Sequence, residues 1–137
     1  MVTVPQLVKM VRDRYLKIRP GTTAYDINNG SCEEFADDLI SLIPGASVWN
    51  IVESTQMLLD EHKKMAKMGI KFVGEPTNLV VNYKGTIIDL PGHYWIKWKG
   101  RHYDAECPDG VKDWLELPVF KNSIRRQILK KRGRKNG

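Results

Sequence analysis

The chain of 137 residues is 42% hydrophobic and 9% aromatic, which excludes an intrinsically disordered protein and fits one compact domain. No apolar run approaches the ~20 residues of a membrane-spanning helix, and two cysteines are too few for a disulfide framework, so we expect a cytoplasmic protein with free thiols. The formal net charge of +6 by itself suggests a protein that binds nucleic acid or another anionic surface.

The first predicted element is an amphipathic helix over residues 4–18, where apolar side chains recur at helical spacing. Thr3 and Gln6 have the spacing of a capping box, which predicts where this helix begins. A polar loop is expected next, over residues 22–30.

The second predicted helix begins at Cys32. Ser31 and Glu34 have the spacing of another capping box, and Pro44-Gly45 predicts the end of the helix. Cys32 is therefore placed in the first helical turn.

The central and C-terminal parts of the chain predict mainly strands. A short strand is expected over residues 47–52, followed by a third helix that Ser54 caps and that runs to about Met68. Two β-hairpins follow over residues 79–90 and 93–105, with two-residue turns at Lys84-Gly85 and Lys99-Gly100, and then a loop over 106–110 and a basic helix over 119–131. This order predicts an α+β fold in which N-terminal helices pack on an antiparallel β-sheet.

Cys32 is the first candidate catalytic residue. A helix N-terminus favours a thiolate because the helix dipole and the unpaired backbone N–H groups attract negative charge. Four acidic residues in the first two turns oppose this by raising the thiol pKa, namely Glu33, Glu34, Asp37 and Asp38. A protonated histidine nearby is needed to outweigh them.

The second hairpin supplies such a histidine. With a turn at Lys99-Gly100, Trp95 faces Asp104 and His93 faces Glu106, and all four side chains share one sheet face. Asp104 is then the diagonal neighbour of His93 and can orient the imidazole and stabilise its cation. Glu106 is the alternative for that role, and a one-residue bulge would change the choice.

Three segments resemble the papain-like and transglutaminase-like cysteine enzymes, in particular their compact bacterial and viral members: Asn29–Ala36, Gly92–Ile96 and Gly100–Asp104. In that superfamily a nucleophilic Cys begins a helix, a His starts a strand, and an Asp or Asn lies on the next strand. The resemblance implies a papain-like or transglutaminase-like core, and a peptidase or isopeptidase that forms a thioester acyl-enzyme.

The resemblance also implies roles for individual residues, beginning with a Cys32–His93–Asp104 triad. Papain-like enzymes usually have a Gln upstream of the Cys as an oxyanion donor, whereas this chain offers Asn28 or Asn29 there. Trp95 is expected to shield the His–Asp hydrogen bond, and Trp95 and Trp114 are candidates for binding a protein or peptide substrate. No cofactor or metal is expected.

Two alternatives remain open. The same triad would serve a transamidase or a deamidase, which differ in the acyl acceptor or in the amide attacked. The second alternative is a binding module without catalysis, because the eight basic residues after residue 120 leave the first 120 residues with a net charge of −2. We therefore expect one domain over residues 1–120 and a basic helix or tail over 121–137, which would bind nucleic acid or an acidic partner.

Overall fold

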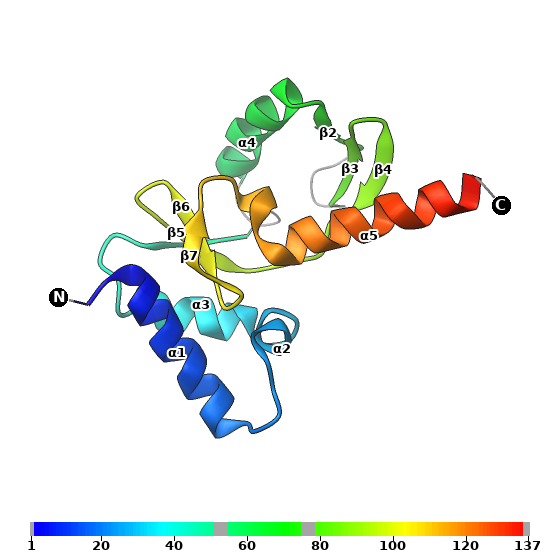
Figure 1. Ribbon diagram of the computed structural model, residues 1–137. Coiled ribbons are helices and arrows are strands. Elements are labelled where there is room, and N and C mark those ends of the chain that lie inside the picture. The colour runs from blue at the N-terminus through cyan, green and yellow to red at the C-terminus, as the bar shows by residue number, and fades with distance from the viewer. Residues whose placement is uncertain (1, 51–54, 75–78, 136–137) are drawn as a thin grey trace. The chain divides into compact units, whose positions relative to one another are not determined.

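The computed structural model describes residues 2–50, 55–74 and 79–135, and it confirms an α+β protein in which N-terminal helices pack against antiparallel sheets (Figure 1). The chain divides into two compact units. The first unit comprises Met1–Trp49 and His93–Val119, and the second comprises Asn50–Gly92 and Phe120–Gly137. The division into a domain over residues 1–120 and a basic helix or tail over 121–137 stays a prediction.

The first unit opens with α1 (Val4–Ile18), which begins at the predicted capping box. The backbone N–H of Gln6 donates to Thr3 Oγ1 at 3.3 Å, and the backbone N–H of Thr3 donates to Gln6 Oε1 at 2.8 Å. Each side chain thus satisfies a backbone donor that has no partner within the helix.

A short helix, α2 (Ala24–Asn28), lies where the sequence predicted a loop. Thr23 and Asp26 form its capping box, in which the Thr23 backbone N–H donates to Asp26 Oδ2 at 2.8 Å. The prediction was wrong because the third position holds Asp rather than the usual Glu or Gln, and because the helix is too short to show a periodic apolar face.

The helix α3 (Cys32–Ile40) begins at Cys32, as predicted, but without a capping box. The Ser31 side chain makes no capping hydrogen bond, because ψ of 20° keeps Ser31 out of the extended conformation that capping requires. The backbone N–H of Ser31 donates to the carbonyl of Ile27 at 2.9 Å. This hydrogen bond connects the start of α3 to α2.

The four-stranded antiparallel sheet of this unit has the order β1-β5-β6-β7. Its strands are β1 (Ser47–Trp49), β5 (Trp95–Trp98), β6 (Arg101–Asp104) and β7 (Cys107–Val111). Trp98 pairs with Arg101 and Ile96 with Tyr103, which confirms the register predicted from the Lys99-Gly100 turn.

The strand β7 was predicted as a loop, because Pro108 and Gly110 are unfavourable inside a strand. The strand lies at the edge of the sheet, where a proline need not donate a hydrogen bond. Gly110 has φ of 78°, and the ring of Tyr103 occupies the space that a Cβ would take, so this position requires glycine.

The core of the first unit lies between the helices and this sheet. Helix α1 contacts β7, and α3 contacts β5. The packed residues come from both helices and from the sheet and include Val8, Val11, Phe35, Leu39, Ile96 and Tyr103.

The second unit contains α4 (Thr55–Lys67), a three-stranded antiparallel sheet and most of α5 (Pro118–Lys135). The sheet has the order β2-β3-β4, with β2 (Ile70–Phe72), β3 (Val80–Tyr83) and β4 (Thr86–Asp89). The predicted hairpin is confirmed by the pairing of Tyr83 with Thr86, whereas the three-residue β2 was not predicted. The predicted cap Ser54 and strand residues 51 and 52 lie outside the described residues.

The basic segment after residue 120 is a folded helix that packs within the second unit. Phe120 and Ile124 are buried. Gln127 Nε2 donates to the carbonyl of Asp89 at 2.7 Å, and the backbone N–H of Asp89 donates to Gln127 Oε1 at 2.9 Å. Lys131 Nζ donates to the carbonyl of Ile87.

In the part of the chain that the structure describes, no helix is long and apolar enough to cross a membrane.

Candidate active site

The three predicted triad residues all belong to the first unit. Cys32 is the first residue of α3, Asp104 is the last residue of β6, and His93 lies just before β5. The contact between α3 and β5 and the pairing of β5 with β6 hold these segments together.

His93 and Asp104 form a buried pair. His93 Nε2 lies 3.0 Å from Asp104 Oδ2, and the two side chains are 0% and 1% exposed. The other carboxylate oxygen, Asp104 Oδ1, accepts the backbone N–H of Glu106 at 3.0 Å. The structure therefore places Asp104 beside the imidazole, while the Glu106 side chain bonds elsewhere.

The thiol of Cys32 interacts with the same imidazole. Burial raises the pKa of Cys32, but hydrogen bonds with His93 and with the backbone of Tyr94 outweigh it and bring the thiol pKa below its ordinary value. Burial lowers the pKa of His93, but the hydrogen bonds with Asp104 and Cys32 raise it to about 9. Both shifts favour a thiolate and an imidazolium at neutral pH.

The His93 imidazole lies at the end of a stack with two tryptophans. The ring of Trp95 stacks on His93 with centroids 5.9 Å apart, and the ring of Trp114 stacks on Trp95 at 5.6 Å. Trp95 Nε1 donates to His102 Nδ1 at 2.9 Å, and this hydrogen bond fixes the orientation of the Trp95 ring. Both tryptophans are buried, so in this structure they present no face to a substrate and lie where they exclude water from the imidazole.

The two predicted oxyanion candidates lie in different surroundings. Asn29 is exposed, and its Nδ2 donates at 2.7 Å to the carbonyl of Tyr25 in the preceding helix α2. Asn28 is 3% exposed, and its Nδ2 donates to Glu106 Oε1 at 2.8 Å. Of these two, only Asn28 bonds to a residue that also contacts Asp104. No local pattern in the sequence predicts this bond, because its partners are 78 positions apart.

A cavity of about 630 Å³ opens beside Cys32. Tyr94 lines one part of it, and the rest comes from the loop before α3 and from the acidic face of that helix: Gly30, Ser31, Cys32, Glu33, Glu34, Asp37 and Asp38. None of the side chains lining this cavity is basic. The acids that the sequence placed near the thiol therefore face the space from which a substrate would approach.

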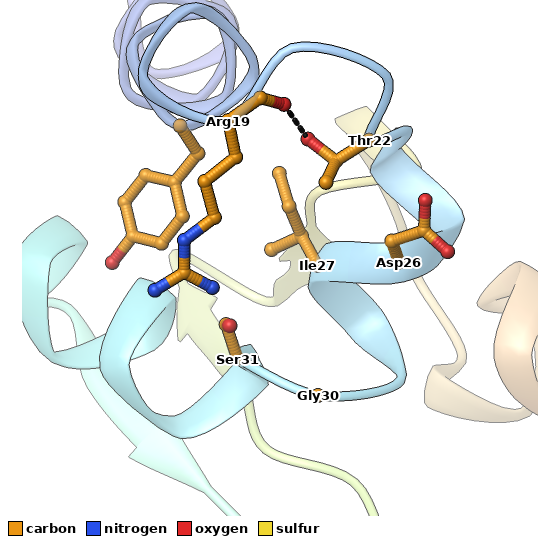
Figure 2. Close-up of a pocket in the computed structure, with 7 residues that line it drawn as sticks. Arg19, Thr22, Asp26, Ile27, Gly30 and Ser31 are labelled. Atoms are coloured by element: carbon orange, nitrogen blue, oxygen red, sulfur yellow. Dashed lines mark hydrogen bonds between the residues drawn. The ribbon is translucent and has the colours of Figure 1, made fainter.

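A second, smaller pocket of about 190 Å³ adjoins the first, since Gly30 and Ser31 line both. Figure 2 shows the guanidinium of Arg19 extending toward Ser31 within this pocket. Its other lining residues come from α1 and α2 and the segment between them: Tyr15, Thr22, Asp26 and Ile27. Four acidic side chains thus line the first cavity, whereas one basic and one acidic side chain, Arg19 and Asp26, line the second.

Cys107, the other cysteine, lies on β7 and is half-buried. Burial and the charge of Asp104 raise the pKa of its thiol, so it is less reactive than an ordinary cysteine. Within residues 2–50, 55–74 and 79–135, no three His, Cys, Asp or Glu side chains are arranged to hold a metal ion.

Comparison with protein-family models, with curated proteins and with solved structures found no match to this chain.

Proposed function

We propose that the protein is a cysteine hydrolase that cleaves amide bonds through a Cys32–His93–Asp104 triad, and that its first unit is a compact papain-like or transglutaminase-like core. One observation supports this above the others. A buried imidazole bonds to a carboxylate through one nitrogen and interacts with a thiol at a helix N-terminus. That combination activates a thiol at neutral pH.

The proposed reaction has two halves. The Cys32 thiolate attacks the amide carbonyl carbon and forms a C–S bond, and the oxyanion that results is stabilised by backbone N–H groups at the start of α3. The C–N bond then breaks, and the His93 imidazolium gives its proton to the leaving amine. Water next attacks the thioester while His93 accepts a proton, and Cys32 leaves as a thiolate.

Asp104 holds the imidazole in place throughout both halves. Its carboxylate accepts from Nε2, so the other ring nitrogen, Nδ1, is the one that exchanges protons with the thiol and the amine. The stacked Trp95 ring keeps water away from this bond, which strengthens it.

A different acceptor or amide gives the related reactions. An amine that attacks the thioester instead of water makes the protein a transamidase, and a glutamine side-chain amide as the substrate makes it a deamidase. All three reactions need the same acyl-enzyme at Cys32, so one experiment tests them together.

The test is the pH dependence of Cys32 alkylation by iodoacetamide in a Cys107→Ala background. We expect Cys32 to react at pH values well below those at which an ordinary thiol ionises, and His93→Ala to abolish this. A mass-spectrometric search for a thioester on Cys32 after mixing with an activated acyl donor tests the second step, with Cys32→Ala as the control. An ordinary thiol profile that His93→Ala leaves unchanged would refute the proposal.

A second role, docking to nucleic acid or to an acidic protein, is compatible with the first. It is supported by α5, because no acidic residue occurs between residues 118 and 137. Among residues 118–133, whose exposure the structure describes, five bases are exposed: Lys121, Arg125, Arg126, Lys130 and Arg132. Such a helix would bring the enzyme to an anionic partner.

A further inference from the structure

The hydrogen bond between Asn28 and Glu106 joins two segments that each carry part of the proposed triad. Asn28 is the last residue of α2, and Glu106 lies in the turn between β6 and β7. The distance from Asn28 Nδ2 to Glu106 Oε1 is 2.8 Å, which is short for a nitrogen donor and typical of a charged acceptor.

At one end of this bond, Asn28 is tightly connected to Cys32. Three residues separate them, and the backbone N–H of Ser31 donates to the carbonyl of Ile27 at 2.9 Å. The start of α3 therefore follows the position of α2, and a shift of Asn28 would displace the thiol.

At the other end, Glu106 is connected to the imidazole. Its backbone N–H donates to Asp104 Oδ1 at 3.0 Å, and Asp104 Oδ2 lies 3.0 Å from His93 Nε2. The chain of contacts thus runs from α2 through Glu106 and Asp104 to His93.

The orientation of the Asn28 amide is set by this contact. An ionised carboxylate only accepts hydrogen bonds, so the nitrogen and not the oxygen of the amide must face Glu106. Asn28 Oδ1 is buried and has no hydrogen-bond partner among the residues that the structure describes. Since buried polar atoms are usually paired, an amide that leaves its oxygen unpaired is unfavourable for stability alone.

We propose that Asn28 and Glu106 form a positioning pair that holds Cys32 at the correct distance from the His93–Asp104 pair. This proposal rests on the proposed function. Glu106 then acts through Asn28 and Asp104 and is not the third member of the triad. Neither residue of the positioning pair needs to touch the substrate.

The test compares variants of the pair with a matched control from the same segment. Asn28→Ala and Glu106→Ala remove the bond, whereas Glu106→Gln keeps an acceptor oxygen. Tyr25→Ala is the control, because Tyr25 belongs to the same helix as Asn28 and its side chain is exposed. All variants are measured in the Cys107→Ala background and below their unfolding temperatures.

We expect each alanine variant of the pair to slow Cys32 alkylation at pH 7 by about 10- to 100-fold, as misplaced reacting groups do. The apparent thiol pKa should rise toward its ordinary value. The double variant should be no slower than the single ones, because both remove the same contact. Glu106→Gln should restore most of the rate, and Tyr25→Ala should leave it unchanged.

The imidazole gives a second readout that does not depend on the proposed reaction. The contact with Cys32 raises the pKa of His93, so displacement of the thiol should lower that pKa in an NMR titration of Asn28→Ala. An unchanged His93 pKa together with an unchanged alkylation profile would overturn the positioning role, even where the variants unfold at lower temperature. An absence of acylation in the wild type would instead refute the proposed function.

Discussion

His93 is a buried titratable residue whose charge depends on its neighbours. Its side chain is fully buried, and it would be costly to charge there without a partner. Asp104 supplies the compensating charge, and Cys32 interacts with the same ring. A neutral imidazole would lack the proton that the leaving amine requires, so the pKa of His93 determines the pH range in which the proposed reaction runs.

The pKa of about 9 for His93 predicts the alkaline limit of the reaction. The rate of acyl transfer should fall as the pH rises through about 9, because the imidazolium loses its proton there. The acidic limit should lie below the ordinary pKa of a thiol, since the pKa of Cys32 is lowered. A pH profile of kcat/KM measures both limits, and a rate that stays constant well above pH 9 would contradict the assignment of His93 as the acid.

The same shift links stability to pH. The folded-state pKa of His93 lies above the value of about 6.5 for an unfolded chain. The stabilisation from its proton is therefore fully present below pH 6.5 and is lost as the pH rises through about 9. Replacing Asp104 by Asn should cost about 3–5 kcal/mol at pH 6 and less above pH 9, measured by denaturant unfolding. An equal loss at both pH values would show that the pair is not ionised.

At the level of the secondary-structure elements, the β5–β6 hairpin determines most of the site. Lys99 and Gly100 both have positive φ, of 46° and 76°, and form the tight turn that suits a two-residue hairpin. This turn sets the register, and the register brings Asp104 next to His93. That is why the sequence could predict the His–Asp pair.

Other parts of the site could not be predicted in this way. The Asn28–Glu106 bond depends on how α2 packs against the β6–β7 turn, and α2 itself has no periodic apolar face. The strand β7 could not be predicted from the sequence, because it contains Pro108 and Gly110, which are unfavourable inside a strand. Local patterns predicted the cap of α1 and both hairpin turns, whereas contacts between distant segments required the structure.

Gly110 gives a prediction for the β6–β7 pair. A Cβ at this position would lie 2.6 Å from Tyr103 Cε1, and φ is 78°. Gly110→Ala should therefore destabilise the protein by about 2 kcal/mol or more in denaturant unfolding, from backbone strain and overpacking together. Gly100→Ala is the matched control, because φ is also positive there but nothing lies within 4 Å of the added Cβ. Equal losses for the two variants would contradict the role of the Tyr103 contact.

At the level of the whole molecule, the net charge of +6 does not describe either charged region, because acidic and basic side chains gather in different places. The acids of α3 line the cavity at Cys32, and the bases of α5 belong to the other compact unit. Removing residues 121–137 would also remove the buried Ile124. The effect of the lost charge on binding could then not be separated from the effect of the lost packing on folding. Substitution of exposed bases is the cleaner experiment.

Four exposed bases of α5 are suitable for it: Arg125, Arg126, Lys130 and Arg132. Their replacement by Gln should weaken binding to a polyanion such as single-stranded DNA and reduce the slope of log K against log salt by about three, since each lost phosphate contact contributes about 0.7. Replacing the exposed Arg14 and Lys17 of α1 is the control and should change the slope little. Binding that is insensitive to the α5 substitutions would exclude docking through this helix.

The acidic lining of the cavity has a further consequence, for the local concentration of small molecules around the thiol. Four carboxylate side chains line a hollow that also exposes Cys32, and no basic side chain lies among them. They enrich cations and deplete anions near the sulfur, to a degree that declines as ionic strength shortens the Debye length. We therefore expect a positively charged thiol reagent to reach Cys32 more readily than a negatively charged one of the same size.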